Sequence, residues 1–203
     1  MRRRPPHAKF SFKSKRRLVF GISLLILIVL YALKNTSFLV RGFSAISVLL
    51  VFYLADHLFT IHFRLRHYFY ILFIAIAGFM LSPLYFIYPN YDKILHFVQP
   101  LMFSSVVFYM VSKLDLKLKW KLITTFFIVT SCLALFEIGE YVLDLAFDFK
   151  LQGVYLWDIK GINKFQLLMD RIDDTMVDLI IGNIAAGIYW FSTYLYLRKK
   201  HPY

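Results

Sequence analysis

Apolar residues occur in long runs along this chain, separated by short polar connections. A membrane-spanning helix needs roughly 20 mostly apolar residues. Six segments approach that length, and they cover residues 18–33, 42–61, 68–88, 92–111, 122–143 and 175–197. The pattern therefore predicts an all-α fold, a polytopic membrane helix bundle with about six transmembrane helices.

The remaining segments are short and differ in character. Residues 1–17 and 198–203 form basic tails on either side of a six-span domain that covers residues 18–197. The one sizeable connection, residues 144–174, mixes glycines and aromatic residues with the apolar run Phe165–Met169. This mixture favours a re-entrant or interfacial segment over a free loop.

Composition narrows the class of protein further. Of the 203 residues, 60% are hydrophobic and 18% are charged, whereas a soluble domain averages about 25% charged. These values exclude an ordinary cytosolic enzyme, a disordered protein and a nucleic-acid-binding module. The net charge of +12 therefore does not indicate a nucleic-acid partner, and membrane lipids are the expected partners. Cys132 is the single cysteine, so no intrachain disulfide can form.

The distribution of charge predicts the orientation of the bundle. With both termini on the cytoplasmic side, 17 of the 24 Lys and Arg residues lie inside and 7 lie outside, as the positive-inside rule requires. The acids show the opposite bias, because ten of the twelve then lie on, or just within, the outer face. The net charge of +12 is thus the sum of two opposed surfaces.

Three groups of ionisable residues recur at helical spacing, three, four or seven positions apart. The groups are Asp92 with His96, Glu137 with Glu140 and Asp144, and Asp174 with Asp178. Residues at these spacings share one face of a helix. The predicted topology places the three faces at a similar depth near the outer surface, so we expect them to meet.

Ionised carboxylates within a membrane are costly and usually functional. For Asp92, Asp173 and Asp174 a structural role is equally plausible, because an acid at a helix start caps backbone amides and suits the helix dipole. Glu137 and Glu140 lie inside a predicted span, where a purely structural bundle has no need of them. Asp56 lies toward the other side of the membrane, and we expect it to pair with Arg64 or Arg66.

The three groups belong to motifs that resemble those of the VanZ-like and YjdF-type bacterial membrane proteins. The motifs are Asp92-Lys93-x-x-His96-Phe97, Glu137-x-x-Glu140-Tyr141 and Asp174-Thr175-Met176-x-Asp178-Leu179, followed by Asn183 and Gly187. The resemblance covers roughly residues 91–187 and is stronger to the YjdF type. It implies a small polytopic protein of the bacterial cytoplasmic (inner) membrane and supplies no activity.

The sequence leaves three hypotheses of function. The first is a membrane-embedded enzyme acting on a lipid or lipid-linked substrate, by acid/base chemistry or through a divalent cation held by oxygen ligands. Its candidate catalytic residues are Asp92, His96, Glu137, Glu140, Asp174 and Asp178. The second is a non-catalytic scaffold that binds a cationic ligand or partner, and the third is an ion-coupled carrier.

Overall fold

The apolar runs form six α-helices in the computed structural model, which describes residues 7–33, 36–147, 149–157 and 165–200. The helices are α1 (His7–Leu33), α2 (Thr36–Leu58), α3 (Leu65–Ala75), α4 (Tyr91–Val111), α5 (Leu118–Phe147) and α6 (Arg171–Lys200). The predicted all-α class is confirmed. The chain divides into two units, Met1–Ser82 and Pro83–Tyr203.

Four of the helices are long and apolar enough to cross a membrane. The qualifying stretches are Arg41–Leu58, Tyr91–Val111, Leu118–Phe147 and Arg171–Lys199, and they overlap four of the predicted spans. Large apolar side chains also remain exposed on these helices, as on α5, where Leu135 is 66% and Leu145 is 75% exposed. Such faces suit contact with lipid. The other two spans and the sidedness of the bundle stay predictions.

In the first unit, α2 packs against α1, against α3 and against a π-helix, η1 (Ile76–Met80). A small core of Ile26, Ala45, Ile46 and Ala75 joins these elements. The helix α1 begins at His7, so part of the predicted basic tail is helical, while residues 1–6 lie outside the described residues.

The segment predicted as one span over 68–88 is not a continuous α-helix. After α3 the chain forms a π-helix, η1 (Ile76–Met80), and then a 3₁₀-helix, η2 (Ser82–Phe86). Pro83 lacks a backbone N–H and cannot continue an α-helix without loss of a hydrogen bond. Periodicity of apolar residues alone does not register this change of helix type.

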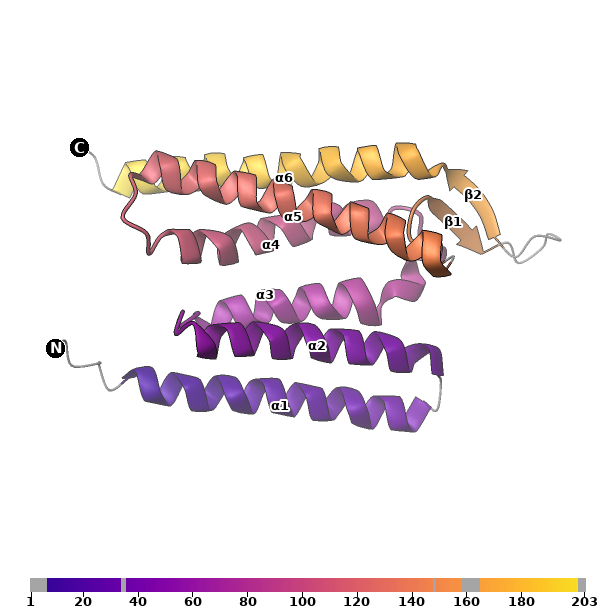
Figure 1. Cartoon of the computed structure of the whole chain (residues 1–203), viewed down its shortest axis with the longest axis horizontal. Helices are drawn as coiled ribbons and strands as arrows, with labels where there is room; N and C mark the ends of the chain where they lie inside the picture. The colour runs from indigo at the N-terminus through magenta and orange to yellow at the C-terminus, as the bar shows by residue number, and fades with distance from the viewer. Residues whose placement is uncertain (1–6, 34–35, 148, 158–164, 201–203) are drawn as a thin grey trace. The chain divides into compact units, whose positions relative to one another are not determined.

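In the second unit, α4, α5 and α6 pack against one another, as Figure 1 shows. Val107, Val111, Val129 and Ala186 form their common core. The start of α4, the end of α5 and the start of α6 lie at the same end of this unit (Figure 1), because consecutive helices run antiparallel.

Close packing in this unit depends on one small residue. A Cβ atom on Gly182 of α6 would lie 2.7 Å from a methyl group of Leu133 on α5 and 3.5 Å from the backbone oxygen of His96 on α4. Gly182 therefore lets three helices approach, a common use of glycine in membrane bundles. Asn183 adds a polar link, since its side-chain oxygen accepts a 2.6 Å hydrogen bond from the Thr130 hydroxyl.

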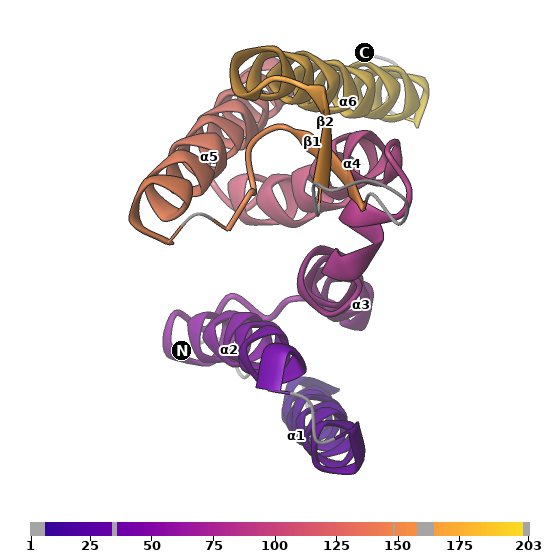
Figure 2. The same cartoon turned by 90° about the vertical axis from the view of Figure 1, so that its right-hand side faces the viewer.

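The connection between α5 and α6 is a two-stranded antiparallel hairpin of β1 (Val154–Trp157) and β2 (Phe165–Met169). It lies at the end of the unit where α5 stops and α6 begins, as Figures 1 and 2 show. The predicted connection 144–174 is thus shortened by both helices, and residues 148 and 158–164 within it lie outside the described part. The hairpin itself was not predicted.

Candidate functional site

Lys93 lies at the centre of the acidic residues in the second unit. Its Nζ atom is 2.8 Å from both carboxylate oxygens of Asp178 and 3.1 Å from Oδ2 of Asp92. It also donates a hydrogen bond to Oδ1 of Asp174. One ammonium group is therefore shared by three carboxylates, two of which, those of Asp174 and Asp178, are buried. The net charge of these four groups, the ammonium and the three carboxylates, is negative when all of them are ionised.

His96 lies beside this group, one helical turn after Asp92, and its side chain is only 8% exposed. Its Nε2 atom is 3.5 Å from Oδ1 of Asp92 and 4.0 Å from Oδ2 of Asp178. Its Nδ1 atom is 3.7 Å from Oε1 of Glu137. The imidazole thus has carboxylates on both sides, at distances longer than the usual N–H···O bond of about 2.7–3.2 Å.

The two glutamates of α5 differ in their surroundings. Glu137 is buried and faces both His96 and the Thr175 hydroxyl, which lies within hydrogen-bonding reach. Glu140, one turn later, is half-buried, and among the described residues it has neither a hydrogen bond nor an ion pair. Its carboxylate lies close enough to Glu137 and Asp92 to interact with them electrostatically. The structure therefore brings all six predicted site residues to one end of the unit, while their roles stay a prediction.

Two acids bind the backbone that leads into the hairpin, Asp144 of α5 and Asp174 of the cluster. Asp144 accepts hydrogen bonds of 2.8 and 2.9 Å from the backbone amides of Leu151 and Gln152. Oδ2 of Asp174 accepts one of 2.8 Å from the amide of Gly153. Asp144 shares the sequence spacing of Glu137 and Glu140, but its carboxylate accepts hydrogen bonds from the backbone of the connection and not from the cluster.

Tyr85 of η2 supplies a polar hydroxyl near the same acids. Tyr85 lies close enough to Asp92 and Glu140 to interact with them electrostatically. A phenol hydroxyl is protonated at physiological pH and can act as a hydrogen-bond donor. Its ring packs edge-on against Tyr91, with 5.2 Å between centroids.

The geometry of the cluster suits two kinds of chemistry. One ligand atom from each of Asp92, His96 and Asp178 lies within 4.8 Å of the others, a spacing at which the three could hold a metal ion. A buried imidazole between carboxylates is also the arrangement of a general acid or base, because a neighbouring carboxylate orients the ring and stabilises its charged form.

A separate ionic network lies in the first unit and corrects one prediction. Asp56 does not pair with Arg64 or Arg66. Its Oδ2 atom accepts hydrogen bonds of 2.8 Å from Lys15 and 2.7 Å from the Tyr68 hydroxyl. Its Oδ1 atom accepts one of 2.9 Å from the backbone amide of Phe63. Packing of α1 on α2 brings Lys15 to Asp56 across 41 positions of sequence, a contact that local spacing does not reveal.

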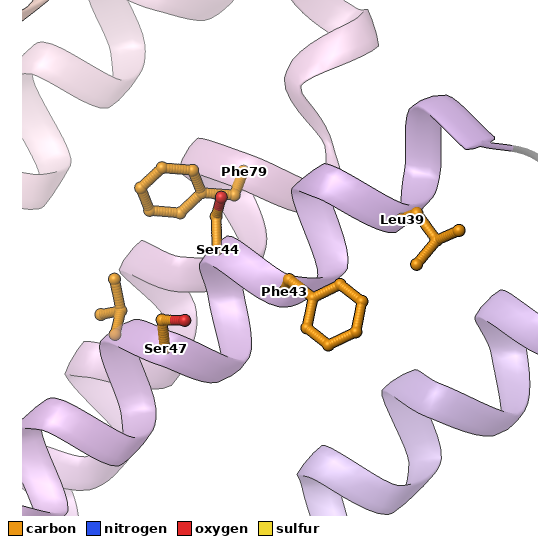
Figure 3. A pocket seen from close by; sticks show the side chains of 6 residues that line it. Leu39, Phe43, Ser44, Ser47 and Phe79 are labelled. Carbon is orange, nitrogen blue, oxygen red and sulfur yellow. The ribbon is translucent and has the colours of Figure 1, made fainter.

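The first unit also carries an open, mainly apolar groove of about 610 Å³. Leu39, Phe43, Ser44 and Ser47 of α2 and Phe79 of η1 line it, as Figure 3 shows. The groove contains no charged side chain among its lining residues. None of its lining residues belongs to the acidic cluster.

A family model described as a predicted membrane protein, DUF2238, matches residues 15–199, nearly the whole chain. The chain belongs to the DUF2238 family. No curated protein and no solved structure matches it at a significant level. Family membership and the apolar helices together make this DUF2238 member a multi-pass membrane protein.

Sequence reasoning identified the acids and His96 of this DUF2238 member but did not give Lys93 its central place. Lys93 adjoins Asp92 in sequence, and adjacent residues do not face each other on a helix. Its long side chain reaches the carboxylates of α6 nevertheless. Gln152 was also missed; its side-chain amide donates a 3.0 Å hydrogen bond to the Thr175 hydroxyl.

Proposed function

We propose that this DUF2238 member is a membrane-embedded enzyme that carries out acid/base chemistry on a lipid or lipid-linked substrate, with His96 as the proton-transferring group. The observation that carries the proposal is the placement of His96. Its ring is buried, with Asp92 and Asp178 near one nitrogen and Glu137 near the other.

Each neighbour of His96 has a role in this proposal. Glu137, 3.7 Å from Nδ1, orients the imidazole and stabilises the imidazolium that forms when Nε2 takes a proton. Nε2 lies on the side of Asp92 and Asp178, so the proton is exchanged there. General acid/base catalysis by a positioned histidine contributes typically 10²–10⁴-fold to rate.

The location of the cluster supports a membrane-borne substrate. His96 lies in the second turn of α4, and Asp178 lies at the start of the third turn of α6. Both helices are apolar enough to span a membrane, so their first turns belong near the interface where lipid headgroups lie. Under the predicted topology this is the outer face of the bacterial inner membrane. The motif resemblance to YjdF-type proteins favours the same placement.

The test is turnover by the purified protein in vesicles of total bacterial lipid extract. Mass spectrometry of the lipids, with assays of released phosphate and fatty acid, should reveal a product that depends on protein. His96→Gln should reduce its rate at least 100-fold, whereas Asp115→Asn, in the exposed α4–α5 connection, should not. Unchanged lipids with folded wild-type protein, or full turnover by His96→Gln, would contradict the proposal.

A further inference from the structure

Lys93 is hydrogen-bonded to the two carboxylates that a metal ion would need, those of Asp92 and Asp178. The three potential ligands within 4.8 Å of one another are Asp92, His96 and Asp178. Lys93 Nζ is hydrogen-bonded to both oxygens of Asp178 and to one oxygen of Asp92. Because both oxygens of Asp178 already accept hydrogen bonds from the ammonium, a metal ion that binds Asp178 would compete with Lys93 for them.

His96 is the independent observation that points to an external cation. Its side chain is more than nine-tenths buried and is directed into the group. The carboxylate oxygens that surround it lie 3.5, 3.7 and 4.0 Å from its ring nitrogens, beyond the usual hydrogen-bond length. Among the described residues no hydrogen bond shorter than 3.5 Å reaches the His96 ring nitrogens, and a metal ion in the group would give Nε2 a ligand bond.

We propose that Lys93 is a tethered counter-cation that competes with a divalent metal ion for Asp92, His96 and Asp178. In the state described here, the ammonium neutralises part of the acidic charge. When a divalent ion enters, the ammonium leaves its carboxylates and the ion takes its place. A mixed set of carboxylate and imidazole ligands is compatible with Mn²⁺ and with other first-row ions.

The side chain of Lys93 is suited to such an exchange. A lysine carries a compact charge on a flexible four-carbon stem, and Lys93 is 16% exposed, compared with 2% for Asp178. The ammonium therefore has a route toward the rim of the site. There it would be placed to pair with an anionic group, such as the phosphate of a lipid headgroup. The inference thus rests on the proposed function for its substrate class but not for the metal site.

The competition can be measured by titration of the purified protein with Mn²⁺, monitored by electron paramagnetic resonance of the free ion. Lys93→Gln should bind Mn²⁺ at least tenfold more tightly than the wild type, because the competing charge is gone. The matched control, Lys119→Gln on the exposed start of α5, should leave the affinity unchanged. Addition of Asp178→Asn to Lys93→Gln should abolish the gain.

A second variant covers the event that Lys93→Gln does not fold with its carboxylates uncompensated. Lys93→Gln with Asp174→Asn removes one negative charge together with the ammonium, and it retains all three proposed ligands. It too should bind Mn²⁺ at least tenfold more tightly than the wild type. Equal affinity in the wild type and in whichever of these two proteins folds would overturn the inference.

The two proposals can fail separately. Lipid turnover that depends on His96, without any gain of Mn²⁺ affinity on loss of Lys93, would refute the competition and leave the enzyme in place. A gain of affinity in a protein that leaves lipids unchanged would establish the metal site and refute the proposed reaction. The Mn²⁺ readout needs no substrate, so it does not depend on the choice of lipid.

Discussion

The ion pair between Lys15 and Asp56 gives the sharpest test of the packing of the first unit. Lys15 is 2% exposed, and Asp56 is fully buried. Replacement of Lys15 by Met keeps an apolar stem of similar length and removes the ammonium. The Asp56 carboxylate then remains buried, and within the described ranges it keeps hydrogen bonds from Tyr68 and from the backbone amide of Phe63 alone.

The expected cost follows from the burial of both partners. Removal of one partner from a buried ion pair typically destabilises a protein by about 3–5 kcal/mol, because it leaves an uncompensated charge. Lys15→Met should therefore lower the free energy of unfolding by an amount in this range. Addition of Asp56→Asn should recover at least ~1 kcal/mol, since the amide carries no charge and its oxygen can still accept a hydrogen bond.

The assay is reversible unfolding of the purified protein in mixed detergent micelles, with helix content as the signal. Lys13→Met is the matched control, because Lys13 lies on the same helix and is exposed; surface substitutions usually change stability by less than about 0.5 kcal/mol. Equal stability of the Lys15→Met and Lys13→Met proteins would refute the reasoning. A double variant less stable than Lys15→Met would refute the charge argument in particular.

Three further predictions concern the second unit. Gly182→Val should destabilise it by about 1–3 kcal/mol through overpacking, because a Cβ already meets Leu133 at 2.7 Å, whereas Gly187→Ala, with open space around its Cβ, should cost nothing in the same unfolding assay. Gly153→Ala should destabilise by about 1–3 kcal/mol, since this residue has a φ of +88° and its Cβ would lie 3.2 Å from a backbone oxygen; retained stability would contradict this reasoning. Asp144→Ala should speed hydrogen exchange of the amides in residues 151–157, and an unchanged rate would show that this carboxylate does not hold the connection.

The main helices of the second unit could be predicted because the membrane limits the choices. Within lipid the backbone must satisfy its own hydrogen bonds, so a long apolar run predicts a helix with little ambiguity. The match between residues 92–111 and α4 (Tyr91–Val111) reflects this constraint. The change from α3 to a π-helix and then a 3₁₀-helix could not be predicted in this way, since all three are compatible with the same apolar sequence.

The candidate site could be predicted only in part, because helical spacing describes the backbone and not the reach of each side chain. Helical spacing placed Asp92 with His96 and Asp174 with Asp178, and the antiparallel order of the helices brought the faces together. Spacing does not describe where a long side chain ends, so the position of Lys93 required the structure. Asp144 shows that spacing alone does not define a site: it shares the spacing of Glu137 and Glu140, but it lies at the end of α5 and accepts hydrogen bonds from the backbone amides that follow.

The two oxygens of Asp174 have different partners, and this makes the hairpin a reporter of the site. Oδ1 accepts from Lys93, and Oδ2 accepts from the amide of Gly153 at 2.8 Å. A change in the cation at one oxygen alters the charge available to the other. The exchange rate of a single amide proton, outside the spanning helices, should therefore follow the occupancy of the acidic cluster before any substrate is known.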